Sequence, residues 1–408
     1  MRYIDFVDLR HEPSEDDVLC DFHFVSEGMS SKEAAGAIAA ESSIGTWTEL
    51  TTVKPYVEGL RATVYRIDGD ECSIAYPIEL FEPGNVANIL SSVAGNVFGL
   101  EALKRLRLND VRFPEALVRG FEGPRYGVEG VRELLRVRDR PLVGTIIKPK
   151  LGLRTRDHAE VAYDAWVGGC DIVKDDENLS SQAFNPFEDR VTETLEMGDR
   201  AEEETGERKA YMVNVSAETE EMLRRAEYVK EQGGLYAMVD IITCGFSALQ
   251  TLRKRDLGLA IHGHRAGHAA FTRMEGHGIS MRVIAKVARM IGVDQLHVGA
   301  AVGKMSETRE EVLENVEALE RQMYGLRRVL PVASGGLHPG LVPEIMRIFG
   351  RDMVIQAGGG IHGHPMGSRA GAAAMKQAVT AVMEGRTLKD FSRDHEELTA
   401  ALRTWSGG

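Results

Sequence analysis

The sequence is poor in cysteine, and the few cysteines it has are not paired. Among 408 residues there are four, and they lie far apart: Cys20, Cys72, Cys170 and Cys244. No two of them form a C-x-x-C pair, so neither a zinc site nor a disulfide framework is indicated. Buried free thiols are the simpler interpretation of all four.

Long apolar runs and an excess of basic charge are also missing. No run reaches the roughly 18 residues that a membrane-spanning helix needs, and the first residues contain no apolar signal core. We therefore expect a cytoplasmic protein with no membrane partner. The net charge of −13 argues against nucleic acid as a partner, because such partners need a basic surface. A phosphate ligand would need local positive charge within its own site.

The sequence pattern over residues 1–121 predicts a small α+β domain of the ferredoxin-like kind. A capping-box pattern at 30–33 opens a helix rich in alanine. Strand-like and helix-like stretches of this size suggest one sheet with helices on a single face. These stretches are strands at 18–25, 62–67 and 71–76, extended chain at 105–114, and helices at 30–40 and 85–95. A linker at 121–124 would separate this domain from a second one at 125–408.

The second domain has the rhythm of an α/β barrel. Eight short runs rich in Val, Ile and Leu alternate with longer amphipathic stretches, which fits parallel strands buried by helices. The number of units matches a (β/α)₈ TIM barrel. A doubly wound open sheet is the alternative, but its first unit would lack a dinucleotide glycine fingerprint. The eight runs are 142–147, 170–173, 211–215, 237–243, 257–261, 295–298, 329–333 and 353–356.

Polar, charged or glycine-rich residues follow nearly every one of these runs, where a barrel has its active site. After the second run come Lys174, Asp176 and Glu177. Carboxylates in this arrangement suit Mg²⁺, although a salt-bridged turn is the simpler interpretation of the motif alone. A lysine beside a metal makes sense if it is converted to an acid, such as a carbamate formed with CO₂.

Glycine pairs and basic residues near other strand ends point to a phosphate ligand. Glycines follow the last two runs, where barrels often bind phosphate, although tight turns would also use them. Arg265, His297 and Lys304 supply the local positive charge, and His264 lies beside the arginine. Residues 302–305 look like a hinged lid that carries Lys304. The glycines are Gly335, Gly336, Gly358 and Gly359.

Several long segments resemble the large subunit of ribulose-1,5-bisphosphate carboxylase/oxygenase (RuBisCO), and they extend over nearly the whole chain. Two of them look most like the archaeal, form III branch. The matching segments are AAESSIGTWT at 39–48, GNVFGL at 95–100, GTIIKPKLGL at 144–153, GGCDIVKDDEN at 168–178, HGHRAGH at 262–268, HVGAAVGKM at 297–305, PVASGGLHPG at 331–340 and QAGGGIHGHP at 356–365.

The resemblance implies a role for each matching residue. Lys174 would carry the carbamate, bind Mg²⁺ with Asp176 and Glu177, and take the C3 proton of ribulose-1,5-bisphosphate. Lys148 would protonate the product carbanion, and Lys304 would orient CO₂ or O₂. Lys150 and His264 would support the proton transfers. The expected substrate-binding residues are Glu41, Thr46, Trp47, Asn96, Arg265, His297, Ser334, Gly335, Gly336, Gly358 and Gly359.

The resemblance also implies an assembly and two alternatives. Glu41, Thr46, Trp47 and Asn96 would come from a partner subunit, so a homodimer or a ring of dimers without a small subunit is expected. A RuBisCO-like enolase or isomerase of a related sugar phosphate is the first alternative, and a non-catalytic binding protein is the second. Departures from the usual family pattern put specificity and loop closure in doubt, and they are Ile146, Gly267 and Met305.

Overall fold

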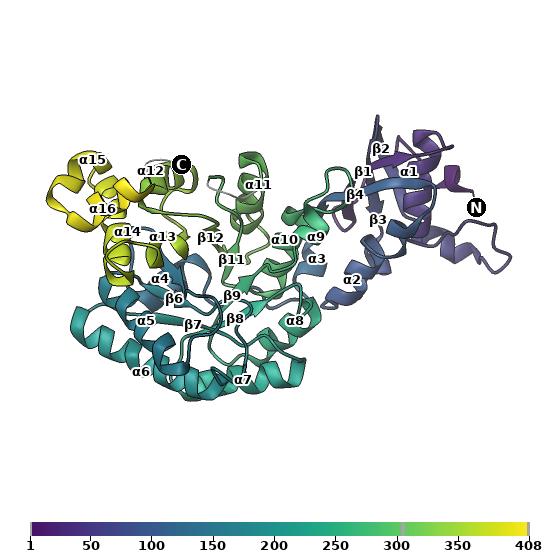
Figure 1. The fold of residues 1–408 in the computed structure, drawn as a ribbon. Helices are drawn as coiled ribbons and strands as arrows, with labels where there is room; N and C mark the ends of the chain where they lie inside the picture. Colours follow the sequence, from purple (N-terminus) through teal and green to yellow (C-terminus); the bar gives the residue numbers. More distant parts are fainter. Residues whose placement is uncertain (1, 303–306, 406–408) are drawn as a thin grey trace. The chain divides into compact units, whose positions relative to one another are not determined.

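The structure is a computed structural model, and it describes residues 2–302 and 307–405. Contacts divide the chain into two compact units (Figure 1). The N-terminal unit comprises Met1–Gly123, Gly267–Ile291 and Arg321–Leu326, and the barrel unit comprises the rest. These units are defined by contacts within one chain, and such units need not fold independently. The expected domain limits, 1–121 and 125–408, therefore stay a prediction.

The N-terminal unit contains a five-stranded sheet in the order β10-β4-β1-β3-β2. The central strand β1 (Val18–Ser26) alternates buried and partly exposed residues, so one of its faces packs inward. Helix α1 (Ser31–Glu41) begins at the expected capping box, in which Ser30 and Glu33 bond reciprocally. The other strands are β2 (Thr63–Asp68), β3 (Glu71–Tyr76), β4 (Leu103–Arg112) and β10 (Gly278–Ile279).

Strand β10 is the one member of this sheet that the sequence did not predict. It has two residues, pairs parallel to β4, and comes from a segment far along the chain. Two residues are too few for an apolar period to be visible. The other α-helices of this unit are α2 (Val86–Val93), α3 (Glu115–Val118), α9 (Ala269–Thr272) and α10 (Met281–Ile291).

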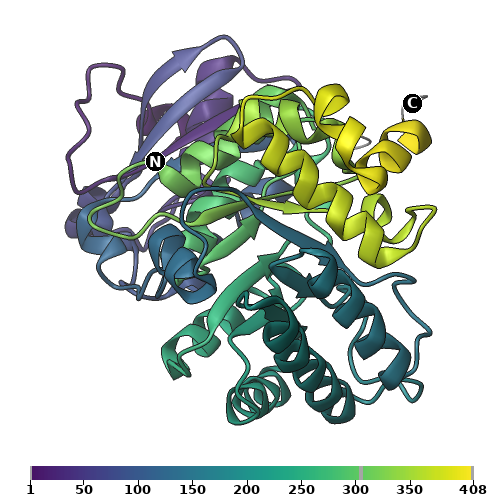
Figure 2. The same cartoon turned by 90° about the vertical axis from the view of Figure 1, so that its left-hand side faces the viewer.

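The barrel unit is a closed barrel of eight parallel strands, which confirms the TIM-barrel prediction (Figure 2). Each strand overlaps or adjoins one of the eight apolar runs, with ends that differ by a few residues. The strands are β5 (Leu142–Ile146), β6 (Ile172–Lys174), β7 (Ala210–Asn214), β8 (Tyr236–Asp240), β9 (Ala260–His264), β11 (Gln295–His297), β12 (Leu330–Ser334) and β13 (Val354–Gln356).

Helices connect the strands and extend beyond the last one. Helices α14 and α16 lie in the tail that follows the last strand. Among the described residues, no helix is both long and apolar enough to cross a membrane. The helices are α4 (Gly127–Leu135), α5 (Thr155–Gly168), α6 (Phe187–Thr205), α7 (Thr219–Glu231), α8 (Phe246–Arg255), α11 (Arg309–Glu320), α12 (Val342–Phe349), α13 (Gly359–His362), α14 (Ser368–Met383), α15 (Leu388–Phe391) and α16 (Glu396–Trp405).

An apolar core fills the end of the barrel at which the strands begin. Val128, Val131 and Leu135 of α4 pack there against the first residues of several strands, including Leu142 and Leu330. Burying these side chains removes this end of the barrel from solvent. Polar side chains gather at the opposite end, so a ligand site is restricted to the carboxyl ends of the strands.

The four cysteines are free thiols, as expected. Cys20, Cys72 and Cys170 are buried, whereas Cys244 is half-buried. Burial raises the pKa of the Cys170 thiol to about 12, so this thiol stays protonated at neutral pH.

Candidate active site

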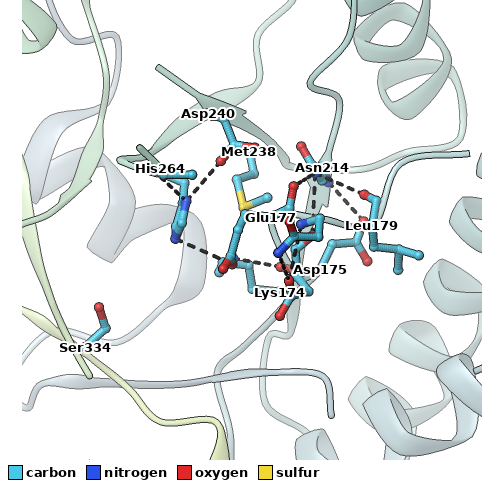
Figure 3. A network of polar contacts seen from close by, with 12 residues as sticks. Lys174, Asp175, Glu177, Leu179, Asn214, Met238, Asp240, His264 and Ser334 are labelled. Carbon is cyan, nitrogen blue, oxygen red and sulfur yellow. Dashed lines mark hydrogen bonds and ion pairs between the residues drawn. The ribbon is translucent and has the colours of Figure 1, made fainter. Parts of the chain in front are cut away.

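Lys174 ends strand β6 with its ammonium nitrogen enclosed inside the barrel (Figure 3). The side chain is fully buried, and its Nζ donates to the Asp175 carbonyl oxygen at 2.7 Å and to Met238 Sδ at 3.2 Å. Glu177 Oε2 lies 3.7 Å from the same nitrogen. Burial lowers the pKa of Lys174, and the nearby carboxylates oppose that shift only in part. The amine is therefore more easily deprotonated than an ordinary lysine.

Asp176 and Glu177 follow Lys174 directly and supply two carboxylates on the inner side of the strand end. Asp176 is buried, and its Oδ2 pairs with Lys148 Nζ at 2.7 Å. Burial raises the pKa of the Asp176 carboxyl, but hydrogen bonds from Lys148 and Asn178 outweigh burial and lower it overall. The pKa of Glu177 is also lowered, since Lys174 and His264 outweigh its burial. Both groups are therefore ionised at neutral pH.

Asp175 lies between these residues but points to the outer side of the barrel wall, because side chains alternate along a strand. Its Oδ1 accepts from Tyr211 Oη at 2.5 Å, and His158 Nε2 lies 3.1 Å away. Its Oδ2 accepts from the Asn214 backbone at 3.0 Å and lies 3.4 Å from Arg190 Nε. Burial alone would raise the pKa of Asp175, but Arg190 and His158 bring it down to about 2. This buried network fixes the strand end from behind.

The two lysines after strand β5 differ in their surroundings. Lys148 is half-buried and pairs with Asp176, whereas Lys150 is exposed. Among the described residues, Lys150 forms no hydrogen bond or ion pair. The structure therefore brings Lys148 to the carboxylates but leaves Lys150 at the mouth.

His264 ends strand β9 and lies between two carboxylates. Its Nδ1 is 2.9 Å from Asp240 Oδ1, and its Nε2 is 3.6 Å from Glu177 Oε2. Burial lowers the pKa of His264, and the carboxylates oppose the shift without reversing it. The Ala266 backbone N–H also lies 3.2 Å from Nδ1, but the Asp240 carboxylate is closer and can only accept, so it favours a proton on Nδ1. In that tautomer Nε2 is the acceptor, near Glu177.

Arg265 is not free in this structure, because its guanidinium forks onto Glu307. Nη1 pairs with Oε1, and Nη2 donates to Oε2 at 2.9 Å. Both side chains are largely buried. The sequence alone gives no sign of this pair, because Glu307 stands 42 positions further along the chain. An anion that binds Arg265 must share it with Glu307 or displace Glu307.

His297 and Ser334 meet on the adjacent strands β11 and β12. His297 Nδ1 lies 2.7 Å from Ser334 Oγ, and His297 Nε2 lies 2.9 Å from His262 Nε2. Both ring nitrogens of His297 are therefore engaged within the protein. Ser334 ends β12 and is partly exposed, whereas His297 and His262 are buried, so Ser334 is the member of the group nearest the mouth.

The glycines after β12 and β13 allow two loops to approach each other closely. Gly335 and Gly336 have φ of 117° and 73°, which side chains larger than glycine rarely adopt. A Cβ at Gly360 would lie 2.0 Å from the Leu337 carbonyl oxygen. A Cβ at Gly358 would lie 3.1 Å from Lys148 Cε. Of the four predicted phosphate-binding glycines, Gly335 and Gly336 are therefore the two whose backbone conformation itself favours glycine.

The remaining predicted residues lie in the N-terminal unit or outside the described residues. Glu41 ends α1 and accepts from Tyr3 Oη at 3.1 Å. Thr46 is in the following loop, Trp47 is 81% exposed, and Asn96 opens a short 3₁₀ helix (Asn96–Gly99). Lys304 and Met305 lie outside the described residues.

The two other departures from the family pattern have structural settings of their own. Gly267 has φ of 85°, a conformation that side chains larger than glycine rarely adopt. Ile146 is the half-buried last residue of β5.

The donors at the end of β6 fit a hard divalent cation. Two ionised carboxylates lie beside a buried lysine whose pKa is lowered. Within the described part of the chain, no three His, Cys, Asp or Glu side chains gather as a metal site. A carbamate on Lys174, as the resemblance implies, would add a third oxygen ligand beside these two carboxylates.

Four residues of this site were missed or left without a role by the sequence reasoning: Asp175, Met238, Asp240 and Glu307. The role of Asp175 could have been inferred from the sequence. Side chains alternate along a strand, so this acid is expected on the outer face, and a buried acid there needs a cation as partner. Met238 and Asp240 belong to β8. The pairing of β8 with β9 brings Asp240 to His264, and the packing inside the barrel brings Met238 to Lys174.

The chain is similar to known proteins over its full length. The family model described as ribulose bisphosphate carboxylase large chain, catalytic domain, matches residues 127–405. The corresponding N-terminal domain model matches residues 5–117. A curated relative from Methanocaldococcus jannaschii, named ribulose bisphosphate carboxylase, is 50% identical over 98% of this chain and 100% of its own. A relative with the same name from Pyrococcus abyssi is also 50% identical, over 99% of this chain and 96% of its own.

Two solved structures have the same fold. One is an octameric RuBisCO from Pyrococcus horikoshii OT3 in complex with sulfate, with a TM-score of 0.97 and 50% identity. It aligns with 100% of this chain and 97% of its own. The other is a dimeric archaeal RuBisCO from Hyperthermus butylicus, with a TM-score of 0.92 and 45% identity over 99% of both chains.

Proposed function

Because the chain belongs to the ribulose bisphosphate carboxylase large-chain family, we propose that it carboxylates ribulose-1,5-bisphosphate to 3-phosphoglycerate, with O₂ as a competing reactant. The observation that carries this proposal is the buried Lys174 with Asp176 and Glu177 at the end of β6. Identity of 50% with carboxylases over nearly the whole chain supports it.

Lys174 is the residue that activation modifies. Its neutral amine attacks CO₂, a nitrogen–carbon bond forms, and the amine loses one proton to give a carbamate. The lowered pKa of Lys174 makes the reactive neutral form more available than in an ordinary lysine. Lys174, Asp176 and Glu177 would then hold Mg²⁺. When bound, Mg²⁺ stabilises negative charge on substrate oxygens during enolisation.

Proton transfers are assigned to the groups around this centre. Modified Lys174 takes the C3 proton of the substrate. His264 has a free Nε2 close to Glu177 and can accept or return a proton beside the reacting carbons. Lys148 is held at Asp176 and protonates the carbanion that remains after cleavage. Lys150 and Lys304 support proton transfer and CO₂ orientation.

The two phosphates of the substrate are assigned to two sides of the barrel mouth. Arg265, His297 and Ser334 hold one end of the substrate, and the glycines after β12 and β13 hold the other. Free backbone N–H groups at glycine turns suit phosphate oxygens. For Arg265, the proposal requires the substrate phosphate to compete with Glu307 for the guanidinium.

The protein is proposed to be a homo-oligomer with sites shared between subunits. Related archaeal structures are described as octameric or dimeric. Trp47 and Tyr56 are 81% and 78% exposed, which is unusual for large aromatic side chains unless another chain covers them. In this proposal Glu41, Thr46, Trp47 and Asn96 act at the partner's barrel. The protein works in the cytoplasm without a small subunit, nucleic acid or membrane.

The deciding experiment is incubation with ribulose-1,5-bisphosphate, Mg²⁺ and labelled bicarbonate. We expect acid-stable label in 3-phosphoglycerate. A matched control is the Lys174→Ala variant, which should incorporate none. Consumption of substrate by the unmodified protein without any label in 3-phosphoglycerate would reject carboxylation and leave an enolase or isomerase.

A further inference from the structure

A row of five hydrogen-bonded side chains crosses the barrel interior from the mouth inward. Ser334 Oγ lies 2.7 Å from His297 Nδ1, and His297 Nε2 lies 2.9 Å from His262 Nε2. His262 Nδ1 lies 3.0 Å from Gln295 Oε1, and Gln295 Nε2 donates to Tyr236 Oη at 3.2 Å in the amide orientation of the structure. Only Ser334 and His297 have a role in the proposed function.

The two imidazoles of this row are coupled through one shared proton position. Both rings are buried, and burial lowers the pKa of each well below its usual value. Each ring is therefore neutral and carries a single N–H. The contact between the two Nε2 atoms needs one donor and one acceptor. Whichever ring donates there, the tautomer of the other ring follows, so the row has only two possible directions.

Tyr236 decides between the two directions. Its side chain is fully buried, and within the described chain its hydroxyl has one hydrogen-bond partner, the Gln295 amide. If the amide nitrogen faces this hydroxyl, the phenol proton has no acceptor, which costs about 1–3 kcal/mol. Turning the amide by 180° keeps both contacts and lets the carbonyl oxygen accept from Tyr236. The satisfied row therefore begins with Tyr236 as a donor.

We propose that Tyr236, Gln295 and His262 form a relay that holds His297 as its Nδ1–H tautomer and so makes Ser334 a hydrogen-bond donor toward the substrate. In this direction Tyr236 donates to Gln295, Gln295 to His262, His262 to His297, and His297 to Ser334. The Ser334 oxygen then accepts from within the protein. Its own hydrogen points away from His297, into the mouth.

The outward hydrogen of Ser334 would bind a phosphate of the substrate, and this step rests on the proposed function. A phosphate dianion accepts hydrogen bonds and donates none, so a donor at Ser334 favours it. In the reverse direction the Ser334 hydrogen would turn inward to His297, and oxygen lone pairs would face the anion. Tyr236, Gln295 and His262 are thus positioning residues, since they act on the substrate only through His297 and Ser334.

Neutron diffraction from crystals of the deuterated protein tests the relay directly. We expect deuterium on His297 Nδ1 and on His262 Nε2, and none on His297 Nε2. Deuterium on His297 Nε2 would mean that the row runs the other way and would overturn the proposal. This result does not depend on activity, so a failure of the carboxylase assignment would leave it in place.

Kinetics of Tyr236→Phe provide the functional test. Phenylalanine keeps the ring in the core and removes only the first donor of the relay. We expect KM for ribulose-1,5-bisphosphate to rise about three- to tenfold, because that change corresponds to the loss of one ordinary hydrogen bond. We expect kcat to change less than about twofold. The matched control is Tyr228→Phe, which removes a hydroxyl bonded to Thr192 on the outer helices.

The two variants separate a relay from general damage to the core. The control should keep the KM of the unaltered protein. An unchanged KM in Tyr236→Phe, or an equal rise in both variants, would contradict the relay. Should Tyr236→Phe fail to fold, the neutron result still decides the question. The affinity for inorganic phosphate, measured by calorimetry, should weaken in the same variant.

Discussion

At the scale of single residues, Lys174 is the side chain whose chemistry depends most on its surroundings. A lysine in water is protonated and does not react with CO₂. Enclosure in the barrel lowers its pKa, and two carboxylates nearby supply the charge that a cation would need.

Activation should therefore depend on both CO₂ and Mg²⁺. Incubation with the two together before substrate is added should raise the initial rate several-fold over either alone. With ¹³CO₂, a carbamate signal should appear in the unaltered protein and be missing from Lys174→Ala. Full initial activity without either component would contradict the account of Lys174.

The buried Arg190 is the cation that holds Asp175 behind the residues proposed to bind the metal. Arg190→Met should lower the free energy of unfolding by about 3–5 kcal/mol, because it leaves a buried carboxylate without its cation. Chemical denaturation would measure the loss. The control is Arg224→Met, which breaks exposed ion pairs with Glu188 and Glu221 and should cost about 1 kcal/mol or less. Equal losses in both variants would refute a special role for Arg190.

His362 should make stability depend on pH in a defined window. Burial and the nearby Lys148 lower its folded-state pKa to about 4, from 6.5 when unfolded. Between these values the unfolded chain binds the extra proton, so stability rises with pH through the window and is lost as pH falls. The full effect of this group is roughly 3 kcal/mol.

The measurement is the free energy of unfolding of His362→Gln and of the unaltered protein at pH 4.5 and pH 7.5. Protein concentration must be held constant, because assembly shifts apparent stability. The variant should lose less stability on acidification. An identical loss in both proteins would show that His362 does not contribute.

At the scale of elements, the loops after β12 and β13 depend on a close approach at Gly360. A methyl group there would meet the Leu337 carbonyl oxygen at 2.0 Å, so one loop must move. Gly360→Ala should therefore raise KM for the bisphosphate substrate about tenfold or more, since misplaced loops lose their shared phosphate contacts.

A second glycine provides the control for this substitution. Gly198 lies in α6, where an added Cβ would meet Trp166 at an ordinary distance of 3.5 Å. Gly198→Ala should leave KM unchanged and stabilise the helix slightly. A normal KM in Gly360→Ala would show that this approach does not shape the site.

The elements also show how far a sequence can be interpreted without its fold. The eight apolar runs predicted eight strands, because each strand is buried on both faces and leaves a visible apolar run. Strand β10 left no such trace. The ends of strands were less certain than their existence; β9, for example, begins at Ala260 and extends to His264, whereas the apolar run had covered 257–261.

At the scale of the whole molecule, the proposal of shared active sites predicts complementation. The Glu41→Gln variant and the Lys174→Ala variant should each be inactive, because each substitution alters every active site of a homo-oligomer. In a mixed dimer, one site combines an unaltered barrel with an unaltered N-terminal domain. The other site combines the altered barrel with the altered N-terminal domain. Random mixing of equal amounts should therefore restore about a quarter of the sites.

Co-expression of the two variants, followed by the labelled-bicarbonate assay, measures this recovery. A mixture of Lys174→Ala with Lys148→Ala is the control. Both changes lie in the same barrel, so no mixed dimer regains an unaltered site. Absence of activity in the Glu41→Gln mixture would indicate that each chain builds its own site.

The local sequence determined the elements of this protein and most of the chemistry at its strand ends. Apolar runs, a capping box and the Lys174 to Glu177 motif are local patterns, and local patterns can be recognised from the sequence alone. Only the tertiary structure decided which side chains meet. The pairing of the strands and the packing inside the barrel bring Met238 to Lys174, Glu307 to Arg265, and Tyr236 into line with Ser334. These contacts join residues tens of positions apart, and no local pattern records them, because they depend on how the strands are arranged in space.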